Sequence, residues 1–278
     1  MRPHIDGIDH LVILVNDLDR AHDTYSRLGF KLTPRGFHSL GSQNHCMMFG
    51  QDYVELLAVP KPHPVMQNFT EFLARSEGLA ALALASGDAR ALYAGLVGSG
   101  IAADAPLDFA RPVEMPGGAR DAAFRIVQLP TAATPGCLSF VCQHFNRDLV
   151  WQPHFQSHPL GVTGIAAIAV TAPNVAAAAR AYAQVLGSKP QAIAEGMLLA
   201  TGGAPVAVCD TRRLRRRLKD ACLPERAAPM VAALFLRLND RTRAADVLRA
   251  GGFTPQWLDD GSLAIGADQA HGVALVFG

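Results

Sequence analysis

A strand–helix–three-strand pattern fills the first sixty residues and constrains the fold more than any other feature of the sequence. An apolar run at 7–15 contains His10. A helix is expected next, because apolar residues recur at helical spacing until Gly29, which can end the helix. Three strand-like stretches follow, at 31–38, 46–50 and 52–59. The last stretch contains Glu55, so the first and last strands of the unit each carry a group able to hold a metal.

Three further copies of this unit follow along the chain. The second begins near Glu77 and the fourth at Val231. The third is the clearest copy, because 167–175 aligns with 10–18. One unit alone would expose an apolar face of its sheet, and a second unit buries that face. The sequence therefore predicts an α+β fold of four βαβββ modules, paired into two domains.

The boundary between these predicted domains lies in a stretch of different character. Residues 146–161 are rich in aromatic side chains and histidine, which indicates an ordered linker that covers part of the protein. We expect an N-terminal domain at 1–145, this linker, and a C-terminal domain at 162–278.

The composition is that of a compact globular protein. Half of the 278 residues are hydrophobic, 18% are charged, and the formal net charge is +1, so no general attraction to nucleic acid or to an anionic membrane is expected. No apolar stretch reaches the roughly eighteen residues of a spanning helix, and the first residues lack the apolar core of a secretory signal. Five cysteines without a CxxC pair fit a reducing cytoplasm.

The basic run at 212–219 is the strongest concentration of charge. Its leucines lie four residues apart, which predicts a helix with one apolar edge and a solvated basic face. Nucleic-acid binding is the less favoured interpretation of this run.

The first unit resembles the vicinal oxygen chelate superfamily, which includes glyoxalase I and extradiol dioxygenases. The resemblance rests on His10 placed seven residues before Asp17, a helix ending Tyr-x-x-Leu-Gly, and the strand Tyr53-Val-Glu-Leu-Leu. The segment 35–44 is similar to the glyoxalase-like branch of that superfamily. The resemblance implies two half-open barrels made by paired modules, with a divalent metal inside a barrel.

Family ligands come from first and fourth strands, which implies His10 and Glu55 in the first module. In the second module the first-strand place falls near Ala81, which cannot bind a metal, and the fourth-strand place near His144. We therefore predict a site of His10, Glu55 and His144 for Fe, Mn, Zn or Ni. The C-terminal domain carries no such residues at these places, with Ala167 where His10 stands. The alternative is that hydrogen bonds inside the barrel satisfy His10 and Glu55.

Polar residues on the glycine-bearing loop at 38–44 are candidates for substrate contact. His38 is a candidate general base near neutral pH. Asn44 and Gln43 are candidates for substrate binding. The alternative for this loop is turn chemistry, in which polar side chains bond their own backbone.

Three further residues are weaker candidates for substrate binding. Gln143 lies beside His144, and Trp151 follows the same strand, where it either closes the cavity or packs the linker. Arg125, like Arg111, offers a bidentate partner for a substrate carboxylate, although surface arginines are common.

These residues favour a metal-dependent enzyme that acts on a small oxygenated metabolite. Chelation of two adjacent substrate oxygens would support lyase or isomerase chemistry. The alternatives are a non-catalytic protein that sequesters a small molecule, and an extradiol-type dioxygenase, against which Ala81 argues. A small-molecule substrate and a homodimer are the expected partners.

Overall fold

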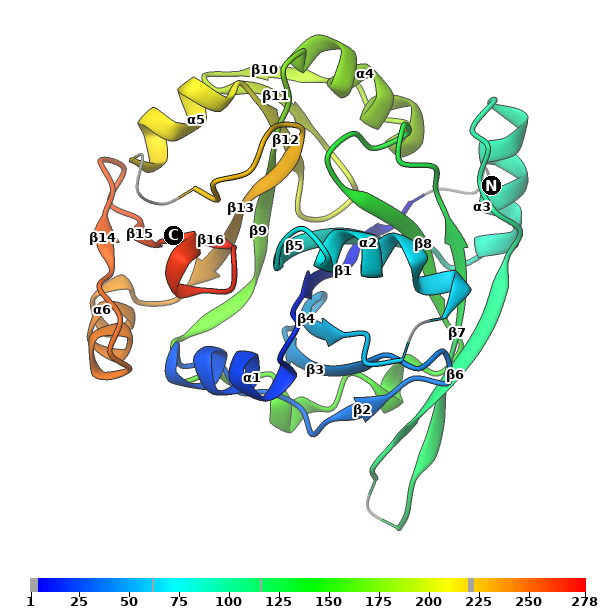
Figure 1. Cartoon of the computed structure of the whole chain (residues 1–278), viewed down its shortest axis with the longest axis horizontal. Helices are drawn as coiled ribbons and strands as arrows, with labels where there is room; N and C mark the ends of the chain where they lie inside the picture. Colours follow the sequence, from blue (N-terminus) through cyan, green and yellow to red (C-terminus); the bar gives the residue numbers. More distant parts are fainter. Residues whose placement is uncertain (1–4, 62, 116, 220–222) are drawn as a thin grey trace.

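Two eight-stranded mixed sheets make up the protein (Figure 1). The computed structural model describes residues 5–61, 63–115, 117–219 and 223–278. The remaining residues, which include Cys222 and the first four residues considered above for a secretory signal, lie outside the described part. Within the described ranges, no helix combines the length and the apolarity needed to cross a membrane.

The first sheet joins the first two modules edge to edge, in the order β2-β3-β4-β1-β5-β8-β7-β6. Its central strands β1 and β5 run antiparallel, and each pairs in parallel with the last strand of its own module. The strands are β1 (Gly7–Leu14), β2 (Gly36–Phe37), β3 (Gln43–Met48), β4 (Tyr53–Ala58), β5 (Gly78–Ala85), β6 (Leu107–Val113), β7 (Arg120–Gln128) and β8 (Leu138–His144). The helices are α1 (Leu18–Arg27), α2 (Gln67–Leu73) and α3 (Ala89–Gly98).

The second sheet repeats this arrangement in the order β10-β11-β12-β9-β13-β16-β15-β14. The strands are β9 (Val162–Thr171), β10 (Gln191–Ile193), β11 (Gly196–Leu199), β12 (Val206–Cys209), β13 (Met230–Leu238), β14 (Gln256–Trp257), β15 (Leu263–Ile265) and β16 (Ala274–Phe277). The helices are α4 (Val175–Leu186), α5 (Thr211–Leu218) and α6 (Arg241–Ala250). The predicted fold of four βαβββ modules in two pairs is confirmed.

The same kind of N-cap starts the first helix of every module. Asp17, Asp88, Asn174 and Asp240 each precede a helix, and each side chain accepts the backbone N–H three residues further on. This N-cap satisfies one of the donors that a helix start leaves without a partner. The repeat is therefore visible in the capping residues as well as in the strand order.

The first sheet curves until its two edges approach each other (Figure 1). Beside β2, the Ser39 amide donates to the Ala110 carbonyl of β6 over 3.4 Å. This contact joins the edges of the sheet, so the first half forms a nearly closed barrel around its interior.

The interior of the second half is filled by a helix. Leu214 and Leu218 of α5 are buried and pack in one cluster with Ala169 and Ala207. Val12 pairs with Glu55 in the first sheet, and Ala169 pairs with Ala207 at the equivalent register of the second. The place of Glu55 is thus taken by an alanine against which α5 packs, while the arginines of α5 stay at least partly exposed, as the sequence predicted.

The two halves share a continuous apolar core. Two buried tyrosines at equivalent positions cross between them: the Tyr25 hydroxyl donates to the Ala270 carbonyl, and the Tyr182 hydroxyl donates to the Pro135 carbonyl. Each half therefore anchors a helix on the other half.

Candidate metal and substrate site

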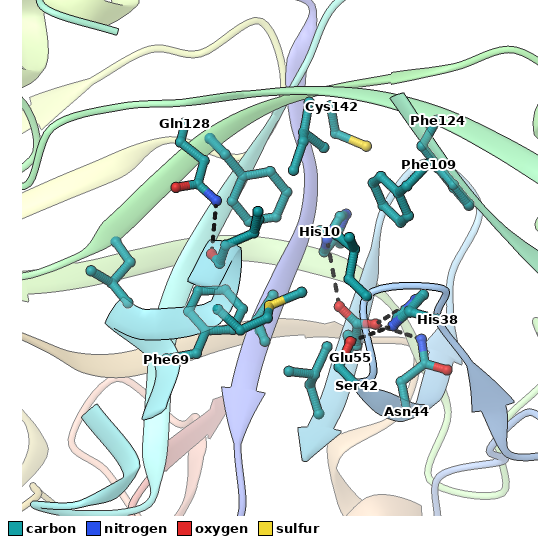
Figure 2. Close-up of a pocket in the computed structure, with 18 of the residues that line it drawn as sticks. His10, His38, Ser42, Asn44, Glu55, Phe69, Phe109, Phe124, Gln128 and Cys142 are labelled. Carbon is teal, nitrogen blue, oxygen red and sulfur yellow. Dashed lines mark hydrogen bonds and ion pairs between the residues drawn. The ribbon is translucent and has the colours of Figure 1, made fainter. Parts of the chain in front are cut away.

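A cavity lies inside the first barrel, beneath α2 (Figure 2). Its empty volume is about 890 Å³, including the part open to solvent. One end is polar and contains His10, His38, Asn44 and Glu55. The remaining wall is mostly apolar, and its aromatic members are Tyr53, Phe69, Phe109, Phe124 and Phe140.

Two imidazoles and one carboxylate point toward one another at the polar end of the cavity (Figure 2). Nε2 of His10 lies 3.7 Å from Oε2 of Glu55, and Nε2 of His38 lies 3.8 Å from Oε1. His10 comes from β1, Glu55 from β4 and His38 from the loop after β2. Both carboxylate oxygens of Glu55 thus face an imidazole nitrogen at a separation too long for a hydrogen bond.

The other nitrogen of each ring is held from outside the cavity. Nδ1 of His10 lies 2.6 Å from Oδ1 of Asp9, and Nδ1 of His38 lies 2.8 Å from Oγ of Ser42. Since a carboxylate only accepts, His10 donates through Nδ1, and Nε2 is the ring nitrogen that faces Glu55. Outer partners of this kind are typical of metal-binding histidines.

A β-bulge explains how neighbours on one strand meet. The pairing of β1 with β5 shifts register between Ile8 and His10, so Asp9 is an extra residue without a direct partner on β5. A bulge of this kind redirects a side chain. It lets Asp9, which would otherwise face away, bond the ring of His10.

Asn44 fixes the carboxylate. Its side-chain amide donates to Oε1 of Glu55 over 2.5 Å, and both residues are buried. Tyr53 stacks on the His10 ring, with 4.4 Å between ring centroids. The polar end of the cavity is therefore held in place before any ligand arrives.

Burial and hydrogen bonding set the charges of His38 and Asp9. Burial lowers the pKa of His38 to about 4, although the Glu55 carboxylate opposes the shift. Burial alone would raise the pKa of Asp9, yet hydrogen bonds from His10 and His144 hold it well below its usual range. At neutral pH the His38 ring is therefore uncharged, and Asp9 is a carboxylate.

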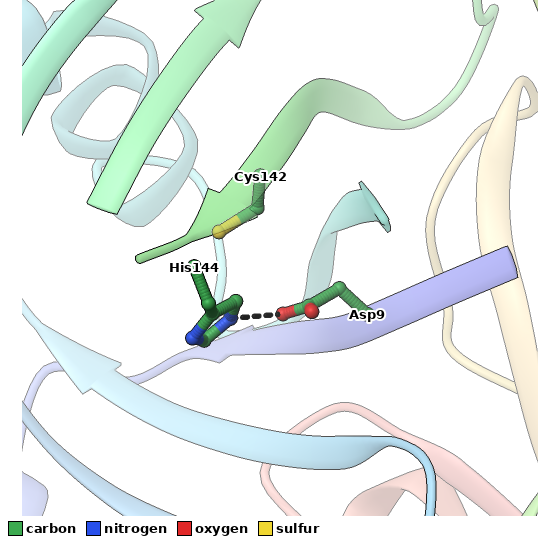
Figure 3. Close-up of side chains that lie close together, drawn as sticks. All are labelled: Asp9, Cys142 and His144. Atoms are coloured by element: carbon green, nitrogen blue, oxygen red, sulfur yellow. Dashed lines mark hydrogen bonds and ion pairs between the residues drawn. The ribbon is translucent and has the colours of Figure 1, made fainter. Parts of the chain in front are cut away.

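His144 lies behind the cavity rather than in its wall. Its Nε2 lies 3.0 Å from Oδ1 of Asp9, the oxygen that also accepts from His10. Cys142 lies beside this pair, and the three residues form a cluster whose ligand atoms are within 4.8 Å of one another (Figure 3). Nδ1 of His144 is buried without a hydrogen-bond partner. The predicted ligand His144 is thus brought to Asp9, and not to Glu55.

Two of the three loop residues predicted to contact substrate lie in the cavity wall, and the third does not. His38 and Asn44 line the cavity, whereas Gln43, the first residue of β3, accepts a hydrogen bond from Arg35 over 3.2 Å.

The remaining predicted substrate contacts lie elsewhere. Gln143 bonds the backbone of Gly87 and Ala89 at the start of α3. Arg125 forms an exposed ion pair with Asp108. Trp151 packs edge-on against His144 in the linker, outside the residues that line the cavity.

Sequence reasoning missed the role of Asp9 and the aromatic wall. Asp9 carried a signal, because a second ionisable residue stands next to His10 in the same apolar strand. The phenylalanines carried none, since their spacing matches that of ordinary core residues. Among the described residues, the arginine that lines the cavity is Arg111 and not Arg125.

The donors at the polar end fit a divalent metal. A neutral ring with its proton on Nδ1 offers a lone pair at Nε2, and both Nε2 atoms face the oxygens of a carboxylate, across 3.7 and 3.8 Å. Acceptors that face one another need a cation or a proton between them, and two imidazoles with a carboxylate suit Fe(II), Mn(II) or Zn(II).

The paired βαβββ modules are those of the vicinal oxygen chelate superfamily. Within it, the chain belongs to the glyoxalase-like domain family, whose model matches residues 8–186. A comparison with curated proteins gave no significant match.

Solved structures share the fold over nearly the whole chain. A hypothetical protein from Staphylococcus aureus aligns with a TM-score of 0.69 and 13% identity over 98% of both chains. The Mn(II)-bound glyoxalase from Novosphingobium aromaticivorans aligns with a TM-score of 0.59 and 13% identity, over 99% of this chain and 82% of that one. A mutant 4-hydroxymandelate synthase from Streptomyces coelicolor aligns with a TM-score of 0.56 and 15% identity, over 92% and 77%. Identities this low establish the fold alone.

Proposed function

We propose that the protein is a metal-dependent enzyme whose divalent metal is held by His10, His38 and Glu55. The observation that carries this proposal is the convergence of two imidazole nitrogens on one carboxylate, with outer partners on both rings. His38 replaces His144 as the third ligand, because it lines the cavity and faces Glu55. The glyoxalase in the comparison is itself named as Mn(II)-bound.

The reaction we propose is of the lyase or isomerase type, on a small molecule with two adjacent oxygens. A bound divalent metal would act as a Lewis acid toward those oxygens. The chain's own contribution is orientation, since Asp9, Ser42 and Asn44 hold the three ligands in place. Enclosure of the site beneath α2 limits the access of water, which strengthens electrostatic contacts inside it.

The wall of the cavity favours a substrate with an apolar or aromatic body and one negative group. Phe109, Phe124 and Phe140 provide flat apolar contact surfaces. Arg111 supplies a cation that can hold a carboxylate in two-point contact. Among the described residues that line the cavity, Arg111 is the only arginine and none is a lysine.

An Fe(II)-dependent oxygenase is the second candidate, on the ground of the donor set. Two histidines and one carboxylate with open positions are typical of non-haem Fe(II) oxygenases. Oxygen uptake by the Fe(II)-loaded protein with a catechol or an aromatic 2-oxo acid would favour this reaction over the first.

Metal content measured on protein purified without chelators tests the proposal. We expect close to one equivalent in the wild type, and a loss in His10→Ala, Glu55→Gln and His38→Ala. His144→Gln, which keeps a donor toward Asp9, is the matched control and should retain the metal. If His38→Ala keeps its metal and His144→Gln loses it, then His144 and not His38 is the third ligand. A wild type that binds ligands but no metal would favour a sequestering protein.

Two further proposals concern the whole protein. We propose that residues 1–145 and 162–278 form two domains, and that the second is structural, because α5 fills its interior.

We also propose a homodimer in the cytoplasm. Light scattering after size-exclusion chromatography measures the assembly directly, and a monomer mass would reject the dimer.

A further inference from the structure

Arg226 lies at the junction of the two halves, where the described residues offer it almost no polar partner. Its guanidinium lies over the ring of Phe72 in α2, 5.0 Å from the centroid. Its one hydrogen bond is long, 3.4 Å from Nη2 to the carbonyl of Val231. Its Nε is buried and has no hydrogen-bond partner. A half-buried guanidinium is thus left with most of its five donors unused.

No carboxylate in the described part of the chain pairs with Arg226. Glu77, in the adjoining groove, is already bound by His271 Nδ1 and by the Asn16 amide, each at 2.7 Å. Burial lowers the pKa of Arg226, and no acidic group among the described residues opposes that shift. Removing a cation from water without an anion is costly, so an arrangement like this calls for a partner.

The surroundings of Arg226 leave room for that partner. The groove that it lines has an empty volume of about 990 Å³, including open solvent, and also contains Arg75, Ser76 and Thr131. Among the described residues that line this groove, none is acidic. At Gly78 a Cβ atom would come within 3.0 Å of Nη2 of Arg226, so a side chain there would crowd the guanidinium.

We propose that this groove is a binding site for an oxyanion, either a phosphate or a carboxylate, centred on Arg226. The planar guanidinium can donate to the oxygens of such a group through its two Nη atoms. Arg75 adds charge, and the hydroxyls of Ser76 and Thr131 add donors. The site is separate from the metal site and takes an anionic metabolite or the anionic tail of one.

The position of the groove connects it to the catalytic cavity. Phe72 and Arg75 lie at the end of α2 and just after it, while Asn68 and Phe69 of the same helix line the cavity. Leu138 lines both spaces. An anion on Arg226 therefore stabilises the helix that covers the cavity.

Thermal unfolding of the full chain in inorganic phosphate or acetate, at constant ionic strength, tests the site. We expect a saturable rise in Tm, since a ligand of the native state stabilises it by mass action. Arg226→Gln should weaken the apparent affinity by about tenfold or more, because it removes hydrogen bonds to a charged group. The anion with the tighter apparent Kd identifies the ligand class.

Arg216→Gln is the matched control, because Arg216 is exposed on α5 and the change removes the same charge. It should leave the response to the anion intact. An equal response in Arg226→Gln, or no saturable response in the wild type, would overturn the proposal.

A second variant separates a ligand site from a structural arginine. Arg226→Met, measured without added anion, should have a Tm equal to or above that of the wild type, because an apolar side chain replaces an uncompensated buried cation. A large drop in Tm would show that Arg226 is structural, and would also overturn the proposal.

Discussion

Asp9 joins two histidines through a single oxygen. Its Oδ1 accepts from Nδ1 of His10 over 2.6 Å and faces Nε2 of His144 at 3.0 Å. The first contact makes Nδ1 of His10 the donor to Asp9 and leaves Nε2 facing Glu55. The second orients Asp9, so His144 acts on the proposed metal through its neighbour. Both are therefore positioning residues.

The first prediction concerns Asp9. Asp9→Asn should weaken divalent-metal binding by about 10- to 100-fold, the usual loss when the outer partner of a metal-binding histidine is removed. The amide carries no charge and presents an N–H group as readily as an oxygen. Calorimetric titration of the metal-free protein with Mn(II) or Zn(II) gives the Kd. In the same assay, His144→Leu should bind more weakly than His144→Gln.

Cys142→Ala is the control, because Cys142 lies beside Asp9 and His144 without a hydrogen bond to either. Its affinity should match that of the wild type. If it loses the metal as completely as Asp9→Asn does, then Asp9, Cys142 and His144 hold the ion themselves, and the positioning role is wrong.

The second prediction concerns Asp52, whose carboxyl is buried where the first half meets β9. It accepts the Ile165 amide over 3.0 Å, but burial raises its pKa from 3.8 to about 6. The folded protein therefore binds this proton more tightly than the unfolded chain, and stability falls as pH rises from about 4 to 6. Asp52→Asn keeps the acceptor and removes the charge. We expect it to stabilise the protein by about 2–3 kcal/mol above pH 6 and by little at pH 4.

Urea unfolding at several pH values measures this difference. A constant gap between the two proteins from pH 4 to pH 7 would contradict the prediction, because a titrating group must produce a pH-dependent gap.

The sequence was sufficient to place His10 and Glu55 in one cavity, because strand order and register follow from the repeat. His144 lies at the end of β8, as expected, but the sequence was not sufficient to predict that its ring faces Asp9 and not Glu55. The bulge at Asp9 moves a competing carboxylate next to that ring. A bulge depends on pairing with the neighbouring strand, and the local sequence does not show which residues of that strand will pair.

At the scale of elements, the strands missed from the sequence are short and lie at sheet edges. Gln191–Ile193 and Gln256–Trp257 show no strand pattern in the sequence, and 31–38 forms a strand only at Gly36–Phe37. Two or three half-exposed residues have no periodicity to detect, and pairing with a neighbour decides their conformation. Helix α5 was predicted because its two leucines recur at helical spacing beside a charged face.

The third prediction concerns α5. Leu214→Ala should destabilise the protein by about 2–5 kcal/mol, because it leaves a cavity against the alanines of the second sheet. Arg212→Ala on the exposed face should change stability by no more than about 0.5 kcal/mol. Urea unfolding measures both. Equal effects would show that α5 does not fill the interior, and metal binding in the first half should be unchanged in either variant.

At the scale of the whole molecule, the two halves are locked together by exchanged contacts. Tyr25 of the first half and Tyr182 of the second are buried and bond carbonyls of the opposite half. The linker is also packed, since the His158 ring bonds the Lys31 amide and the Met48 carbonyl. A domain boundary in the sequence therefore does not imply that the domains are independent in stability.

The fourth prediction is that the full chain unfolds in one transition, and that residues 1–161 alone are far less stable. Without the second half, the apolar residues of α1 that complete the shared core would face water, at about 25 cal/mol for each Å² exposed. Coincident urea transitions by circular dichroism and tryptophan fluorescence test the full chain, because Trp151 and Trp257 lie in different halves. The fragments 1–161 and 162–278 test the parts. Two separated transitions, or a fragment as stable as the full chain, would mean that the exchanged tyrosine contacts contribute little and that each barrel carries its own core.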